Sequence, residues 1–299
     1  MKHVTIQRSR AYANFRSAAG QSNHLLITIL VGLDAVGSGS VEKNPKFSTT
    51  WEPRDVARSA SRSRAYAIST SLVWISDLVD VYRHAVQQLP GVCSEVDLKR
   101  IHGAKDDGRS RRLGRLSRHL GLETSAELAL VQIGFHWRNR VAHSEASGLV
   151  DGDVRGALRL AEKEIRESYS GLDVEELIKH EASGHPPTFK EIASIMAASH
   201  RLVEKLDAAL ATRVDVVQLA EAALKDEICR GPHGDWVERT LSLWPGTPEK
   251  TAAKLTRILL ISGFQETPTS DGRVALPTDY LPSLARLSVQ EARTLFPCG

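Results

Sequence analysis

The sequence predicts a mainly α-helical protein, and two observations carry this prediction. Apolar residues recur at alternating three- and four-residue steps along most of the 299-residue chain, as they do on one face of a helix. A strand-like pattern is found in one short stretch near the C-terminus, after residue 214. We therefore expect an antiparallel helical bundle over residues 1–212, followed by a small α(+β) region over residues 213–299.

The first half of the chain predicts two long helices. One is expected from about Ser9 to Val36, ending at the flexible "GSGS" segment. The other has the clearest pattern in the sequence, from about Ser63 to Leu89, and is stopped by Pro90 and Gly91. Its predicted buried face consists of Leu72, Ile75, Val79, Tyr82, Val86 and Leu89.

A basic segment, "KRIHGAKDDGRSRRLGRLSRHLGL", follows and predicts an amphipathic helix. Arg111, Arg115 and Arg118 share one face, whereas the opposite face is formed by Leu113, Leu116 and Leu120. The arginine face is compatible with two interpretations, a solvated surface or a surface that tracks RNA. The sequence leaves both open.

The next helix, expected over about residues 125–145, is more apolar than its neighbours. "TSAE", from Thr124 to Glu127, has the spacing of a capping box and predicts its start. The apolar residues cover much of its circumference: Leu128, Val131, Ile133, Phe135, Trp137 and Val141. A helix of this kind has to lie deep in a bundle.

Further helices are expected at about Gly152–Tyr169, Val174–His180 and Thr188–Ala211. Between the last two, "HEASGH" from His180 to His185 reads as a loop, because its histidines do not have the spacing of a zinc-protease helix. Near the C-terminus, "TRILLISGF" predicts a helix. The following "QETPTSDGRVALP" predicts a hairpin that turns at Asp271 and Gly272, as in a small winged-helix-like unit.

Charge, cysteine content and hydropathy limit the setting in which the protein works. A net charge of +3 and a pI near 8.8 permit a polyanionic partner without requiring one. Cys93, Cys229 and Cys298 have no paired spacing, so we expect neither a disulfide framework nor a metal cluster. The longest apolar run, Leu25–Leu33, is much shorter than the roughly 20 residues of a membrane span. We expect a cytoplasmic protein without a membrane partner.

One short motif near the end of the apolar helix combines polar residues of a chemically useful kind. In "RNRVAH", Arg138 and Asn139 are adjacent, and His143 follows four residues after the asparagine. An arginine followed by a histidine at this range is expected by chance about three times in this composition, so that spacing alone says little. The chain has only four asparagines, and a chance match to the fuller pattern is on the order of 0.01.

With this motif on a buried helix, the sequence resembles the HEPN superfamily over roughly residues 1–170. The resemblance implies a metal-independent endoribonuclease without a cofactor, in which the RNA's own 2′-hydroxyl attacks the phosphate. Arg138 would bind the phosphate, Asn139 would orient the reacting groups, and His143 would exchange a proton. It also implies a homodimer in which two copies of the motif form one composite cleft.

Other interpretations of the same residues remain open. Arg138 and Arg140 could compensate the negative end of the helix dipole, while His143 satisfies the last carbonyl groups. The protein would then be a non-catalytic helical scaffold or a nucleic-acid-binding regulator, and a metal hydrolase is a third option. For the ribonuclease we expect RNA contacts from Arg111, Arg115, Arg118 and Arg140, a role as toxin or effector in a prokaryotic defence system, and an antitoxin or regulatory partner.

Overall fold

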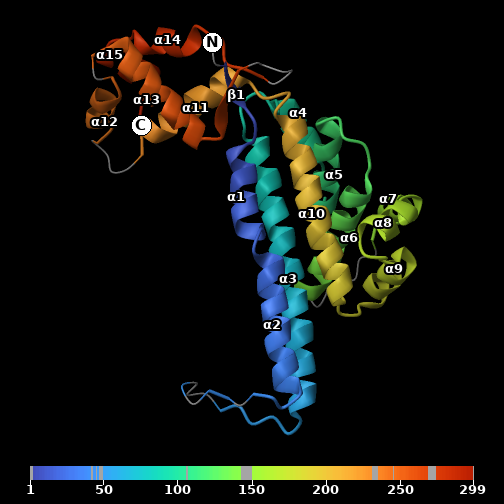
Figure 1. The fold of residues 1–299 in the computed structure, drawn as a ribbon. Helices are drawn as coiled ribbons and strands as arrows, with labels where there is room; N and C mark the ends of the chain where they lie inside the picture. The colour runs from blue at the N-terminus through green and yellow to red at the C-terminus, as the bar shows by residue number, and fades with distance from the viewer. Residues whose placement is uncertain are drawn as a thin grey trace. The chain divides into compact units, whose positions relative to one another are not determined.

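The computed structural model describes residues 3–41, 43–44, 46, 50–105, 107–142, 150–230, 235–244, 246–268 and 274–298. It is mainly helical, which confirms the predicted fold class. Its internal contacts divide the chain into two units (Figure 1). One, here called the helical unit, contains residues 14–83 and 100–205, and the other, the mixed unit, contains residues 1–13, 84–99 and 206–299. The sequence boundary after residue 212 stays a prediction.

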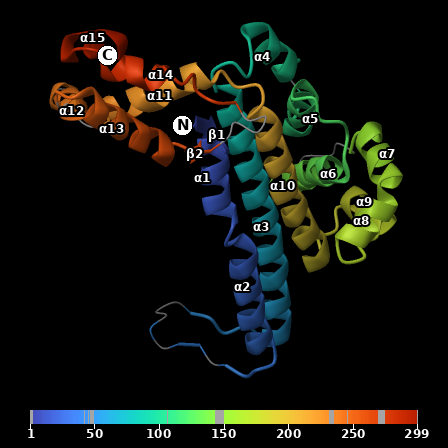
Figure 2. The ribbon, with the colours of Figure 1, turned by 45° about the horizontal axis from the view of Figure 1, so that its top comes forward.

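The central element of the helical unit is α3 (Val56–Gln87). Its predicted apolar face is confirmed, since Leu72, Ile75 and Val79 are inaccessible to solvent. Burial of one such side chain is worth about 1.5–3 kcal/mol, so this face anchors the unit. Figures 1 and 2 show α10 (Phe189–Leu210) alongside α3, and the end of the α2–α3 pair nearest its connecting loop extends beyond α10.

The N-terminal helix expected over residues 9–36 is two helices, so that prediction was wrong in part. α1 (Arg10–Ala19) and α2 (Ser22–Gly37) are separated by a turn at Gly20 and Gln21. Both run antiparallel to α3. On α1, the Phe15 ring contacts the Tyr82 ring of α3 at a centroid distance of 6.2 Å. Near the end of α2, Asp34 forms an ion pair with Arg64 of α3.

The basic segment forms two helices, α4 (Glu95–His102) and α5 (Arg109–His119). Leu113, Leu116 and Leu120 are buried, which confirms the predicted apolar face of α5. The interruption falls at Gly103, which has a positive φ of 63° that favours glycine.

The apolar helix is α6 (Ala126–Ala142), and it is as deeply buried as the sequence predicts. Its predicted capping box is wrong by one position. The backbone N–H of Leu128 donates to the Ser125 hydroxyl, so Ser125 rather than Thr124 caps the helix. Glu127 is buried and accepts a hydrogen bond of 2.8 Å from Lys205 Nζ on α10.

Three shorter helices complete the helical unit. The expected helix over residues 152–169 is interrupted near Ala161 into α7 (Gly152–Leu160) and α8 (Glu162–Ser168). α9 (Val174–Ser183) runs into "HEASGH", so the interpretation of that stretch as a loop was wrong for its first half. Gly184, with a φ of 72°, then ends α9 in the left-handed conformation.

The mixed unit contains α11 (Val216–Ile228), α12 (Asp235–Leu243), α13 (Pro248–Ile261), α14 (Tyr280–Ala285), α15 (Val289–Leu295) and a small sheet. In the sheet, β1 (His3–Ile6) pairs antiparallel with β2 (Phe264–Thr267), and Ile6 faces Phe264. Thr5 also forms an antiparallel bridge with Ala275. The N-terminal strand therefore lies between the two arms of the predicted hairpin, and this corrects the winged-helix-like arrangement. The predicted turn at Asp271 and Gly272 lies outside the described residues.

The cysteines correct a second expectation. Cys229, at the C-cap of α11, and Cys298, beyond α15, form a disulfide with their Cα atoms 5.5 Å apart. They are 69 residues apart in the sequence, so no local spacing could indicate the pairing. Cys93 is not part of this disulfide. In the described part of the chain, none of the helices has the length and apolarity needed to cross a membrane.

Candidate functional site

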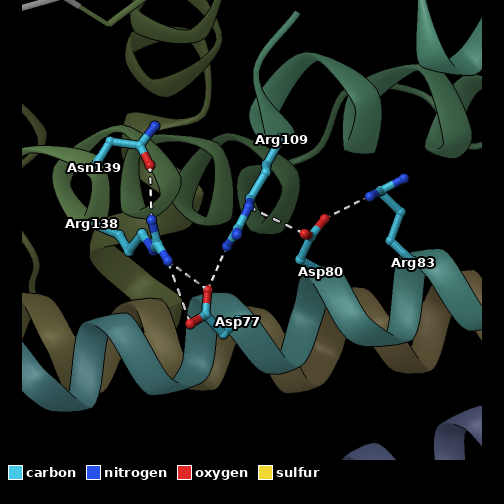
Figure 3. A network of polar contacts seen from close by, with 6 residues as sticks. All are labelled: Asp77, Asp80, Arg83, Arg109, Arg138 and Asn139. Atoms are coloured by element: carbon cyan, nitrogen blue, oxygen red, sulfur yellow. Dashed lines mark hydrogen bonds and ion pairs between the residues drawn. The ribbon is translucent and has the colours of Figure 1, made fainter. Parts of the chain in front are cut away.

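Two of the three motif residues, Arg138 and Asn139, lie side by side in the last turn of α6. The Arg138 guanidinium donates a hydrogen bond of 3.4 Å to Asn139 Oδ1 (Figure 3). A second hydrogen bond, from Arg138 Nη2 to Asp77 Oδ1 on α3, is 3.1 Å long. Only 12% of the Arg138 side chain is exposed, so these contacts fix the orientation of its guanidinium.

Asp77 belongs to a charged cluster that the sequence did not predict. Arg109, the first residue of α5, contacts Asp77 and also binds Asp80 through its Nε at 3.2 Å. Asp80 in turn accepts a hydrogen bond of 2.8 Å from Arg83 Nε, so three helices are joined through one network (Figure 3). In this network the guanidinium groups of Arg83, Arg109 and Arg138 contact the carboxylates of Asp77 and Asp80.

The cluster lies where solvent reaches one side of it. The Asp77 side chain is 43% exposed and the Arg109 side chain 36% exposed, whereas Arg83 is buried. Arg138 Nε is also buried and donates to no hydrogen-bond partner among the described residues. Arg138 and Arg109 lie at the edge of a partly exposed cluster, and guanidinium groups in such a position can bind a phosphate group.

The third motif residue, His143, lies outside the described residues. The predicted relationship between Asn139 and His143 therefore stays a prediction. Arg140, which we expected to contact RNA, is directed instead toward α9. Its guanidinium donates to the Glu181 carbonyl and lies 3.5 Å from Glu181 Oε1. Burial raises the pKa of Glu181, and Arg140 partly offsets that effect.

The three arginines predicted to form an RNA-binding face lie together on one groove of about 650 Å³ between α5, α6 and α7. Two of them are bound to carboxylates. Arg111 forms a bidentate pair with Asp151, and Arg115 binds Asp107 at 2.6 Å. These hydrogen bonds hold the pKa of Asp107 and of Asp151 below the usual carboxyl range. Arg118, which makes no ion pair with a described residue, has the most freely available guanidinium of the three.

Two other histidines, His180 and His136, make contacts within the helical unit. His180 Nδ1 lies 2.9 Å from the buried Glu191 carboxylate, which also accepts the Thr188 N–H near the start of α10. His136, on α6, is partly buried, and burial lowers its pKa with a further contribution from Arg111. Over the described ranges, no group of three or more acidic, histidine or cysteine side chains is arranged to hold a metal ion.

The sequence could not indicate Asp77 and Arg109 as members of the site. Asp77 lies 61 residues before Arg138, and no motif distinguishes it from the other polar residues of α3. Comparison of the chain with protein-family models, with curated proteins and with solved structures returned no match, so similarity assigns it to no family.

Proposed function

We propose that this protein is a metal-independent endoribonuclease of the HEPN type, with Arg138, Asn139 and His143 as its reacting residues. The observation that carries the proposal is the pairing of Arg138 with Asn139 at the partly exposed end of a buried helix. Asp77 holds this arginine in place, and Arg109 lies on the other side of the same carboxylate. Polar groups brought to the end of such a helix are costly unless they are bonded or used.

The chemistry follows from these side chains. The RNA 2′-hydroxyl attacks the adjacent phosphorus, and the bond from phosphorus to the 5′-oxygen breaks. A histidine side chain has a reference pKa near 6.5, so His143 is proposed to accept or supply a proton near neutral pH. Arg138 and Arg109 stabilise the charge that develops on the non-bridging oxygens. The products are a 2′,3′-cyclic phosphate and a 5′-hydroxyl, and DNA is inert because it lacks the nucleophile.

The motif of a single chain supplies one arginine, one asparagine and one histidine. The reaction removes a proton from the 2′-hydroxyl and adds one to the 5′-oxygen, and a single histidine cannot be both base and acid at the same moment. We therefore propose that a homodimer forms the complete site. We also propose, on the resemblance to HEPN ribonucleases, that the activity serves as a toxin or effector that an antitoxin or regulatory partner restrains. RNA contacts are best sought at Arg118, which lies in the groove beside α5.

The test is cleavage of labelled RNA in the presence of EDTA. We expect wild-type protein to cleave, and His143→Ala to lose about 10²–10⁴-fold in rate. Arg138→Ala should lose about 10²–10³-fold. His119→Ala is the matched control, because His119 also follows an arginine, Arg112, at a similar spacing but lies on α5 without an adjacent asparagine.

Two results would contradict the proposal. One is cleavage that needs a divalent metal, and the other is cleavage that survives both His143→Ala and Arg138→Ala. A substrate with a single 2′-deoxy position should resist cleavage at that position only. This result would show directly that the 2′-hydroxyl is the nucleophile.

A further inference from the structure

Large apolar side chains are exposed on one side of the α1–α3 and α2–α3 pairs. On α2 they are Leu25, 55% exposed, and Ile29, 50% exposed. On α3 they are Trp74, 52% exposed, and Val81, 66% exposed. We call these four residues the α2–α3 face. Scattered apolar residues are normal on a protein surface, but a contiguous group indicates an interaction site.

The four residues lie on the same side for a geometric reason. Leu25 and Ile29 immediately precede Leu26 and Leu30, the buried residues of α2. Trp74 and Val81 likewise immediately precede Ile75 and Tyr82, which are buried on α3. Two antiparallel helices are related by a two-fold axis perpendicular to their common plane. Positions one residue before the contact residues therefore point to the same side of that plane on both helices.

Apart from Asp77 at its edge, whose carboxylate contacts Arg138 and Arg109, the remaining positions on this side carry no charge. Those on α1 and α2 are Asn14, Ala18, Gly32 and Val36, and those on α3 are Ser63 and Thr70. A Cβ atom added at Gly32 would have no neighbour within 4 Å, so another backbone can approach closely there. A second copy can face such a surface without like-charge repulsion, which is the usual barrier to self-association.

The size of the surface also fits self-association. From Ser63 to Val81 the helix rises about 27 Å, and two helices side by side are about 20 Å wide. Each copy would then bury about 540 Å², or about 1,100 Å² in total, which clears the roughly 1,000 Å² expected of a specific interface. We propose that the α2–α3 face binds the same face of a second copy around a two-fold axis.

This interface would adjoin the candidate site. Asp77 lies three residues after Trp74 and four residues before Val81, so it sits at the edge of the α2–α3 face. It is also the residue that binds Arg138 and Arg109. The second copy would cover this edge and bring its own cluster nearby. The role in catalysis rests on the proposed ribonuclease function, whereas the docking surface does not.

Sedimentation equilibrium of the full chain tests the interface. We expect a species of twice 32.8 kDa for wild type. Ile29→Arg and Val81→Arg should each weaken the dimer at least about tenfold, because each would bury an unpaired charge. Val31→Arg is the matched control. Val31 is 62% exposed on the same helix but immediately follows Leu30, so it lies on the opposite side. Circular dichroism and thermal unfolding establish that every variant is folded.

The outcomes separate the interface from the ribonuclease. A wild-type protein that is monomeric at all attainable concentrations overturns the interface, even if it cleaves RNA. A dimer that Val31→Arg disrupts as strongly as Ile29→Arg also overturns it. A dimer that Ile29→Arg dissociates, without any RNA cleavage by wild type, supports the interface and contradicts the ribonuclease. Loss of both dimer and cleavage in Ile29→Arg, but not in Val31→Arg, supports both.

Discussion

Arg138 on α6 donates a hydrogen bond to Asp77 on α3, and this contact joins the motif helix to the longest helix of the chain. The same carboxylate contacts Arg109 on α5, so one acidic residue positions two arginines. In the proposed reaction Asp77 is a positioning residue, because it would act on the phosphate only through these guanidinium groups.

Asp77→Asn should lower the rate of RNA cleavage by roughly 10–100-fold, because misplacement of a phosphate-binding group costs about that much. Stability should change by no more than about 1 kcal/mol, since Asp77 is 43% exposed and exposed ion pairs contribute little. Cleavage kinetics and denaturant unfolding measure the two effects separately. Asp34→Asn is the matched control, because it removes the ion pair between Asp34 on α2 and Arg64, which lies elsewhere on α3. Equal effects of both variants on cleavage would contradict the positioning role.

Burial raises the pKa of Glu181, and this shift predicts the sign of a pH effect on stability. The folded protein holds the proton more tightly than the unfolded chain. The free energy of unfolding should therefore fall as pH rises from the usual glutamate pKa through the raised value. Glu181→Gln should flatten this dependence. Denaturant unfolding from about pH 4 to pH 8 measures it, and an unchanged slope in the variant would exclude Glu181 as its source.

Reduction of the Cys229–Cys298 disulfide should destabilise the mixed unit by about 2–4 kcal/mol, because the bond closes a long loop. Thermal unfolding with and without dithiothreitol measures this effect. Cys298→Ser should have the lower midpoint even without reductant. Cys93→Ser, which removes the cysteine outside the disulfide, should respond to reductant as wild type does. Indifference of the wild type to reductant would show that the bond contributes no stability.

Gly134 lies where α6 approaches α10, and a Cβ atom added there would meet Ile195 Cγ2 at 3.0 Å. Gly134→Val should cost about 1–3 kcal/mol through overpacking. Gly156→Ala on α7 is the contrasting substitution, because its Cβ would meet nothing within 4 Å. Alanine should stabilise that helix by up to about 1 kcal/mol. Urea unfolding compares the two, and a stabilising Gly134→Val would mean that α6 and α10 can separate without cost.

Local patterns were sufficient to predict the elements whose burial repeats at the helical period. α3, the apolar face of α5 and the buried α6 all follow from such repeats. The cap of α6 was misplaced by one position, and Glu127, which suggested the capping box, is also bound by Lys205, 78 residues away. A local signal cannot register a competing partner from another part of the chain.

In the candidate site, too, only the residues that are neighbours in sequence could be predicted. Arg138 and Asn139, which the motif singled out, are adjacent in sequence and are joined by a hydrogen bond. Asp77 and Arg109 depend on how α3, α5 and α6 pack together, and no periodicity encodes that packing. The same limit explains why the Cys229–Cys298 pair was not expected.

The position of β1 between β2 and the segment around Ala275 affects the order in which the chain can fold. During synthesis β1 leaves the ribosome before its partners, which are made more than 250 residues later. Until then its backbone groups have no sheet partner, and it is an unpaired strand that can associate with other chains. A fragment that begins after residue 213 lacks this strand altogether. The sheet of the mixed unit can therefore be completed only by a polypeptide that contains both residues 3–6 and residues 264–275.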